Sequence, residues 1–155
     1  MYRFVLFCAL VALVKANTTQ VSQCVNHNGA LPANTHIEGC TTPPCALPQL
    51  QDAVIHLDFQ APRAIQSMRT LATAYLGFIP VPYDLGEKSQ TCNFLSNASC
   101  PVSANQSLQY TLRMPIEPFF PVGIQVNIEF RVVDENNGAL VCLRVPIRIA
   151  PPVVA

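Results

Sequence analysis

Residues 124–149 read IQVNIEFRVVDENNGALVCLRVPIRI, and this stretch decides the fold class. Apolar and polar side chains alternate along residues 124–133, which is the pattern of a half-buried antiparallel strand. Asn137-Gly138 is a strong hairpin signal, so residues 140–149 are predicted to return as the partner strand. Because proline cannot donate a hydrogen bond to a neighbouring strand, Pro146 predicts that this second strand lies at a sheet edge or a bulge.

Three further segments have the same character. Residues 53–59 and 109–114 alternate between apolar and polar side chains, and residues 65–76 form a weaker strand pattern. No window combines an apolar 3.6-residue period with helix caps, so no helix is predicted. Several short strands separated by turn residues favour an all-β protein with two packed antiparallel sheets, a β-sandwich.

Residues 77–84, GFIPVPYD, are apolar but interrupted by two prolines. Proline makes this stretch a poor central strand and an impossible helix interior, so it is predicted to be a loop. Loops of soluble proteins are usually polar. An apolar loop stiffened by proline therefore points either to the closure of an ordinary core or to the rim of a hydrophobic site.

The N-terminus has the features of a secretory signal peptide. One positive charge in residues 1–3 precedes an unbroken apolar run over residues 4–14, and Ala16 offers a small residue for cleavage. The run is shorter than the ~20 residues that a transmembrane helix needs. We therefore expect residues 1–16 to be removed and the secreted chain, residues 17–155, to form a single domain.

Charge excludes some partners. The formal net charge is zero, and only 12% of residues are charged while 50% are apolar. The sequence contains no stripe of basic residues, so nucleic-acid binding is not predicted. Soluble proteins usually have ~25% charged residues. The lower charged fraction and the high apolar fraction of this chain hint at a hydrophobic site.

The cysteines predict a disulfide framework. Cys8 belongs to the predicted signal peptide, and an even set remains in the secreted chain. Six cysteines allow 15 pairings. Their spacing suggests the set Cys40–Cys45, Cys92–Cys100 and Cys24–Cys142. A zinc site is disfavoured because no C-x-x-C pair is present and the histidines are scattered.

Chemistry-bearing motifs are sparse. No nucleophile elbow, zincin motif or P-loop is present, so no catalytic residue is predicted and the chain is not expected to be an enzyme. Glu117, Glu129 and Asp134 are interpreted as ordinary surface charges. The sequons at Asn97 and Asn105 predict glycosylation sites, whereas Asn17 lies too near the expected cleavage point to favour it.

Several local strings together resemble the ML lipid-recognition domain, and within it the Niemann-Pick type C2 sterol-transfer proteins, including arthropod members. The resemblance spans Cys24 to Ile149 and rests on the order of the six cysteines and on short motifs. The motifs are CTTPPC (40–45), GFIPVPY (77–83), CPV (100–102), MPI (114–116) and CLRVPIRI (142–149). It implies the disulfides above and an immunoglobulin-like sandwich whose sheets separate to hold a sterol or lipid tail.

The resemblance also implies a ligand site. Its mouth would consist of Tyr83, Ile116 and Phe120. The walls would be inward strand positions: Ile55, Leu57, Phe59, Tyr110, Met114, Ile128, Phe130, Leu143 and Val145. Capture would be passive burial of apolar surface, worth ~25 cal/mol per Å², with no metal or cofactor. The expected partners are a sterol, fatty acid or similar ligand and a membrane or membrane-protein acceptor, with the protein acting as a monomer.

The chain departs from sterol carriers in two places. Asp-Leu-Gly follows Tyr83 where prolines are usual, and Leu143 stands where tryptophan is frequent. Fatty acids or volatile semiochemicals are therefore as credible as sterols. A lipid-sensing module of innate immunity is an alternative function, and an adhesion-type domain without a cavity is a third. Secretion is expected, with delivery to the endolysosomal lumen as a variant.

Overall fold

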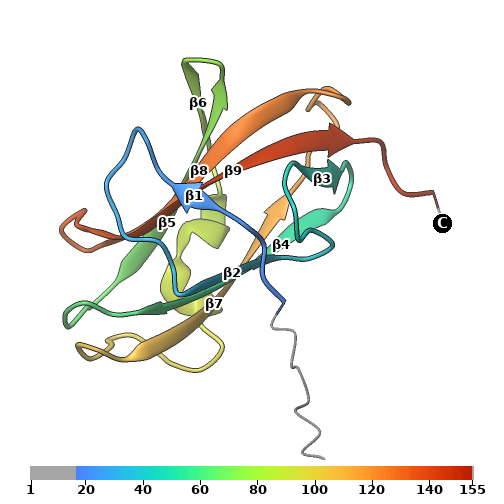
Figure 1. The fold of residues 1–155 in the computed structure, drawn as a ribbon. Helices are drawn as coiled ribbons and strands as arrows, with labels where there is room; N and C mark the ends of the chain where they lie inside the picture. The colour runs from blue at the N-terminus through green and yellow to red at the C-terminus, as the bar shows by residue number, and fades with distance from the viewer. Residues whose placement is uncertain (1–16, 155) are drawn as a thin grey trace, which may run out of the picture.

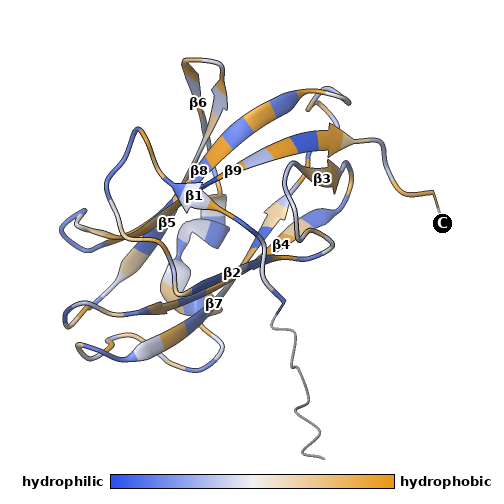
Figure 2. Ribbon diagram, viewed as in Figure 1, coloured by the Kyte–Doolittle hydropathy of each residue, from blue (hydrophilic) through white to orange (hydrophobic). Residues whose placement is uncertain are grey.

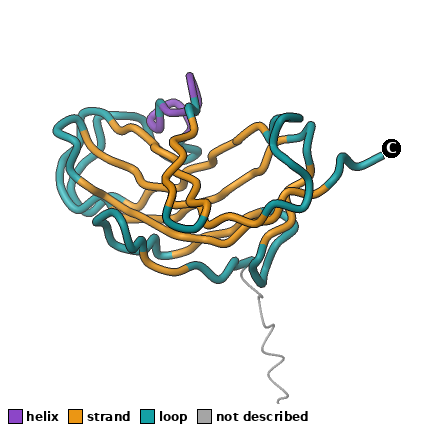
Figure 3. The backbone as a smooth tube through the Cα atoms, turned by 90° about the horizontal axis from the view of Figure 1, so that it is seen from above, coloured by secondary structure: helices purple, strands orange, loops and turns teal. Residues whose placement is uncertain are grey.

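The computed structural model of the protein describes residues 17–154, and the predicted signal peptide lies outside them. The strands are β1 (Ser22–Gln23), β2 (Asn34–Ile37), β3 (Cys45–Pro48), β4 (Asp52–Gln60), β5 (Met68–Leu76), β6 (Ile79–Tyr83), β7 (Ser107–Pro115), β8 (Gln125–Asp134) and β9 (Ala139–Ala150). Two short 3-10 turns, η1 (Gly86–Ser89) and η2 (Thr91–Phe94), lie together at one edge of the molecule, as Figure 3 shows in purple. Within this part of the chain, no helix has the length and apolarity to cross a membrane.

The strands form two sheets that pack face to face (Figure 1). The larger sheet has the order β1-β9-β8-β5-β6, and β3 adds to β9 as its one parallel pair. The smaller sheet has the order β2-β4-β7. Inward side chains of both sheets form one hydrophobic core. The predicted immunoglobulin-like β-sandwich is confirmed.

The hairpin predicted from residues 124–149 is present as β8 and β9. Its turn includes Asn137 at a φ of 60°, the left-handed conformation that asparagine tolerates better than most residues. The inward positions Val126, Ile128, Phe130 and Val132 are all buried. The alternation therefore identified both the strand and the face it turns to the core.

Pro146 does not mark an edge, contrary to the prediction. Strand β9 lies inside the larger sheet, with β8 on one side and both β1 and β3 on the other. Strand β1 pairs with Leu143 and Arg144, and β3 pairs with residues 147–150. Pro146 falls in the gap between these two short partners, where a missing N–H leaves no ladder bond broken.

Residues 79–83 form a strand, which corrects the prediction that residues 77–84 are a loop. Strand β6 pairs with β5 as the outer strand of the larger sheet. Along a strand, alternate N–H groups point away from the neighbour. Pro80 and Pro82 are two residues apart, so both fit outward positions of an edge strand, where they also block pairing with another chain.

Three disulfides are present and match the predicted pairs Cys24–Cys142, Cys40–Cys45 and Cys92–Cys100. Cys24–Cys142 attaches the segment before β2 to the middle of β9 across 118 positions of sequence. Gly29 lies so close to β9 that a Cβ there would be 2.8 Å from the Cβ of Cys142. Only glycine allows this approach, so the disulfide and Gly29 together hold the segment against the sheet.

Candidate functional site

One end of the sandwich encloses an apolar cavity of about 170 Å³ between the two sheets. Strands β5, β6, β7, β8 and β9 and the β7–β8 loop contribute its walls. The lining residues are Ala72, Ala74, Leu76, Val81, Pro82, Tyr83, Met114, Ile116, Phe120, Pro121, Ile124, Val126, Ile128, Ile147 and Ile149. Tyr83 supplies the one polar side-chain group among them, so the cavity favours an apolar guest.

The space exists because strand β5 presents small side chains to the interior. Ala72 and Ala74 lie opposite Phe130 and Ile128 of β8, and opposite Tyr83 and Val81 of β6. Alanine at these two inward positions leaves volume that a leucine or isoleucine would fill. Farther along the same face, Met68 and Thr70 are buried and the core closes.

Aromatic side chains border the opening of the cavity. The rings of Tyr83 and Phe120 meet edge to face with centroids 5.6 Å apart, and Phe119 packs on Phe120 at 4.9 Å. The Tyr83 hydroxyl donates to the carbonyl of Pro115 at 3.0 Å. Burial, followed by the nearby carboxylates of Glu117, Asp84 and Asp52, raises the pKa of Tyr83, so its hydroxyl remains a neutral donor.

The β7–β8 loop is held in place by Gln49. Its side-chain amide donates to the carbonyls of Pro118, at 3.2 Å, and Phe120. At the other end of the loop, Gly123 donates to the carbonyl of Ile149 at 2.8 Å. These bonds position Phe120 against Tyr83 across the opening.

Five of the twelve predicted ligand contacts line the cavity: Tyr83, Met114, Ile116, Phe120 and Ile128. The other seven are buried on inward faces but do not line the cavity. They are Ile55, Leu57, Phe59, Tyr110, Phe130, Leu143 and Val145. Ligand contact itself stays a prediction for all twelve.

Tyr110 illustrates the difference between the core and the cavity. Its hydroxyl bonds to Thr70 at 2.8 Å, and Thr70 bonds to Thr91 at 2.7 Å, all three being buried. Burial raises the pKa of Tyr110 to about 12, because the interior disfavours the phenolate. This hydroxyl cluster ties β5, β7 and η2 together at the closed end of the sandwich.

Ten lining residues were not predicted. They are Ala72, Ala74, Leu76, Val81, Pro82, Pro121, Ile124, Val126, Ile147 and Ile149. Alternation reports which face is buried but not where space remains. The available signal was Ala72-Thr73-Ala74, two small residues at inward positions of a strand beside the proline-bearing segment.

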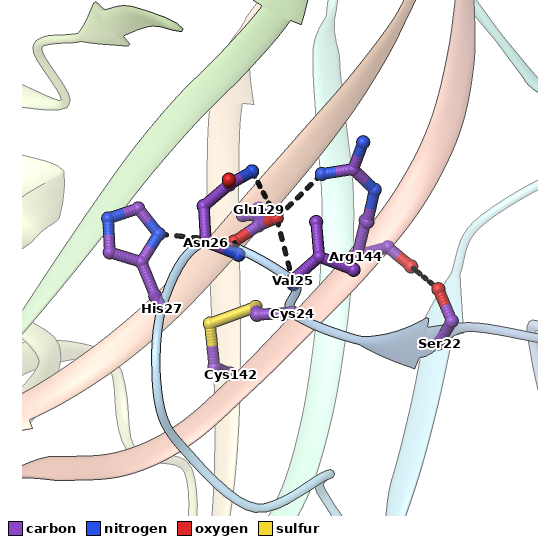
Figure 4. Close-up of polar contacts among 8 residues, drawn as sticks. All are labelled: Ser22, Cys24, Val25, Asn26, His27, Glu129, Cys142 and Arg144. Carbon is purple, nitrogen blue, oxygen red and sulfur yellow. Dashed lines mark hydrogen bonds and ion pairs between the residues drawn. A yellow bond between two sulfur atoms is a disulfide. The ribbon is translucent and has the colours of Figure 1, made fainter. Parts of the chain in front are cut away.

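Glu129 is buried, which corrects its interpretation as a surface charge. It lies on the outer face of the larger sheet, but the segment over residues 24–27 covers it (Figure 4). Its carboxylate accepts from Arg144 at 2.6 Å, from His27 at 3.1 Å, and from the N–H groups of Val25 and Asn26 at 3.3 Å. The Asn26 side chain adds a further bond at 3.3 Å.

The same contacts set the protonation of Glu129. Burial alone would raise the pKa of its carboxyl group. Hydrogen bonds from Arg144, His27 and the backbone N–H groups of Val25 and Asn26 outweigh burial and hold the pKa below the ordinary value. The carboxylate is therefore an anchor for the N-terminal segment.

Asp134 is the second carboxylate that was wrongly interpreted as a surface charge. It is buried at the β8–β9 turn, bonded to Arg63 and to the N–H groups of Asn136 and Gly138. Burial opposes ionisation, but these bonds outweigh it and lower the pKa of Asp134. Glu117 remains partly exposed beside the cavity opening.

Among residues 17–154, one group of potential metal ligands is close enough to hold an ion: Cys24, Glu129 and Cys142. Both sulfur atoms belong to a disulfide, so neither is available as a thiolate ligand. Asn97 and Asn105 are exposed, and the Asn97 amide bonds to the backbone of Ser107 and Gln109. Glycosylation of both stays a prediction.

Comparison with known proteins finds similarity to one family of proteins. A family model of the ML domain matches residues 18–149. A curated relative, NPC intracellular cholesterol transporter 2 of the pig (Sus scrofa), is 22% identical over 144 residues, covering 93% of each chain.

Two solved structures share the fold. A Niemann-Pick type C2 protein from the Japanese carpenter ant superposes with a TM-score of 0.70 at 17% identity, covering 84% of this chain and 98% of the other. Chicken MD-1, solved in complex with lipid IVa, superposes with a TM-score of 0.50 at 11% identity, covering 81% and 85%.

Proposed function

The chain belongs to the ML-domain family, and on that premise we propose that it is a lipid carrier that holds the apolar part of a small ligand between its sheets. The observation that carries the proposal is the apolar cavity bordered by Tyr83, Ile116 and Phe120. Names of the relatives add support, since one is a cholesterol transporter and another was solved with lipid IVa. The ligand classes are a sterol, a fatty acid or a similarly sized hydrophobic molecule, and the carrier is secreted.

The size of the cavity bears on how a ligand enters. Its volume of about 170 Å³ is smaller than the ~300–1,000 Å³ of pockets that enclose drug-sized ligands. A sterol or long acyl chain therefore requires the walls to move apart. The edge strand β6 is the mobile element we expect, because it pairs with the sheet on one side only.

Binding in such a cavity needs no chemistry beyond desolvation. Each Å² of apolar surface removed from water contributes ~25 cal/mol, and the side chains of the lining are apolar except for the Tyr83 hydroxyl. Tyr83 can orient one polar group of the ligand at the opening. We accordingly propose transport and not catalysis.

The first test is to identify what the secreted protein carries. The protein would be purified, extracted with organic solvent, and the extract analysed by mass spectrometry. A near-stoichiometric sterol or fatty acid would establish a carrier and its ligand class. Because volatile ligands escape, an empty extract would be followed by binding of a fluorescent fatty acid and a fluorescent sterol, and failure of both would reject the carrier.

Filling the cavity should separate binding from folding. Ala74→Phe places a large apolar side chain where the lining now has a methyl group, so we expect the affinity for both probes to fall at least about tenfold. The free energy of unfolding should fall by no more than about 1–3 kcal/mol, the cost typical of an enlarged interior side chain, because the added ring occupies existing space. Titration of probe fluorescence and urea denaturation measure the two effects.

The matched control is Ala46→Phe, the same substitution on an exposed position of β3. It should leave the affinity for both probes unchanged. Equal binding by Ala74→Phe and the unmodified protein would place the ligand outside this cavity.

A further inference from the structure

Exposed apolar side chains gather around the cavity opening. The β5–β6 hairpin carries Leu76, Phe78, Ile79 and Val81, and the β7–β8 loop carries Phe119 and Val122. Phe78 is 99% exposed and Phe119 is 73% exposed. Figure 2 shows orange, hydrophobic stretches alternating with paler ones along the β6 hairpin where it projects from the sheet. We call these six residues the apolar rim. Neither Phe78 nor Phe119 lines the cavity, so ligand binding alone does not account for them.

Carboxylates flank the apolar rim. Asp84 directly follows Tyr83, Glu117 directly follows Ile116, and Asp52 pairs with Pro115, whose carbonyl accepts the Tyr83 hydroxyl. Within residues 17–154, none of the three carboxylates forms an ion pair. All three act on the Tyr83 hydroxyl in the same direction, raising its pKa after the larger effect of burial. The opening therefore carries a local negative charge although the whole chain is formally neutral.

Three cations lie on neighbouring segments. Arg113 pairs with Val54, diagonally across the ladder from Asp52, so it lies beside that carboxylate and not beside Asp84 or Glu117. The ammonium group of Lys88 lies 5.1 Å from the centre of the Phe94 ring. Arg148 is exposed between Ile147 and Ile149, which turn inward to line the cavity. Strand alternation directs Arg148 to the opposite, outer face of the sheet.

We propose that the apolar rim docks on a zwitterionic bilayer with choline head groups and discriminates against anionic bilayers. Apolar and aromatic side chains on two projecting segments suit insertion at the boundary of head groups and acyl chains. Choline groups are quaternary ammonium ions, which carboxylates attract and aromatic faces bind. Anionic head groups repel Asp84, Glu117 and Asp52 within a Debye length of about 8 Å at physiological salt.

This inference rests on the proposed carrier function, because docking at the opening matters only if a ligand leaves through it. The test therefore measures loading and transfer separately. The protein is first loaded with the fluorescent fatty acid. It is then mixed with vesicles of phosphatidylcholine alone, or of phosphatidylcholine with phosphatidylglycerol, and both probe transfer and vesicle flotation are recorded.

At low salt we expect transfer to the neutral vesicles to be about tenfold faster than to the anionic ones, with the difference shrinking at high salt. Asp84→Lys combined with Glu117→Lys should reverse the preference. Asp58→Lys with Glu135→Lys makes the same change of net charge near the far end of β4 and just after the end of β8, and it should leave the preference unchanged. Phe78→Ser with Phe119→Ser should abolish flotation with any vesicle while loading continues.

Two results would overturn the inference. One is equal or faster transfer to anionic vesicles at low salt. The other is a loaded protein that neither floats with nor delivers probe to vesicles of any composition, which would assign the apolar rim to a protein partner. Failure to load the probe at all would instead count against the carrier function.

Discussion

Replacing Cys24 and Cys142 together by alanine is expected to lower the free energy of unfolding by about 4–5 kcal/mol. The two cysteines are 118 positions apart, so their bond closes nearly the whole domain into a loop. In the chain-entropy model, a loop of that length removes about 4–5 kcal/mol of conformational freedom from the unfolded chain. Urea denaturation of the variant and the unmodified protein measures the difference.

The short disulfide Cys92–Cys100 provides the matched control. It closes only 8 positions, for which the same model gives about 2–3 kcal/mol. Its double alanine variant should therefore lose roughly half as much stability. Equal losses in the two variants would show that loop closure is not the main source of the stabilisation.

Replacing Glu129 by alanine is expected to cost about 3–5 kcal/mol of folding free energy. The change leaves Arg144, whose side chain is only 18% exposed, without its partner at 2.6 Å. It also removes the acceptor for the N–H groups of Val25 and Asn26. Breaking a buried ion pair from one side typically costs this much, because the remaining charge stays buried and unpaired. Glu87→Ala, at an exposed position of η1, should change stability by less than about 0.5 kcal/mol.

The pH dependence of stability gives an independent check on Glu129. Hydrogen bonds hold its folded-state pKa below the ordinary glutamate value of about 4.3. A group with a depressed folded-state pKa stabilises the fold above its unfolded-state pKa, and this stability is lost as the pH falls through the folded-state pKa. The unmodified protein should therefore lose stability below about pH 4 more steeply than Glu129→Gln. Parallel pH profiles of the two proteins would contradict the assignment.

The stability effects of the Cys24–Cys142 disulfide and of Glu129 should also be coupled. The Cys24–Cys142 bond holds the segment whose backbone N–H groups reach Glu129. Once the disulfide is removed, Glu129→Ala has less structure left to disrupt. The combined variant should fall short of the sum of the separate losses by about 1 kcal/mol or more. Strict additivity would mean that the disulfide and the carboxylate stabilise the segment independently.

Much of the fold could be predicted from local patterns. The alternation in residues 124–133, the Asn137-Gly138 turn and the even set of cysteines identified β8, β9 and the disulfide framework. Each of these signals acts through neighbours in sequence or through a chemistry that few residues share. The short strands β1, β2 and β3 were not predicted, because two to four residues carry too little periodicity to recognise.

The remaining errors concern what lies beside a residue in space. Pro146 was expected at an edge, but β1 and β3 divide one side of β9 between them and leave a gap for it. Residues 79–83 were expected to be a loop, but β5 offers them a partner at the sheet edge. In both cases, the structure of the segment depends on which strand lies beside it and on how many residues that strand pairs. The pattern of residues within the segment does not contain this information.

For the candidate site too, some features could be predicted from the sequence and others required the tertiary structure. By itself, the sequence determined which faces are apolar and, through the family resemblance, placed Tyr83, Ile116 and Phe120 at an opening. Only the tertiary structure decided that the space lies at one end of the sandwich. A cavity forms where the inward side chains of the two sheets do not fill the volume between them, and Ala72 and Ala74 leave such volume beside larger neighbours in their own sheet. It alone decided that Glu129 is buried, since the covering segment comes from about 100 residues earlier and is held there by a disulfide. Burial by a distant segment depends on contacts that alternation along a single strand does not encode.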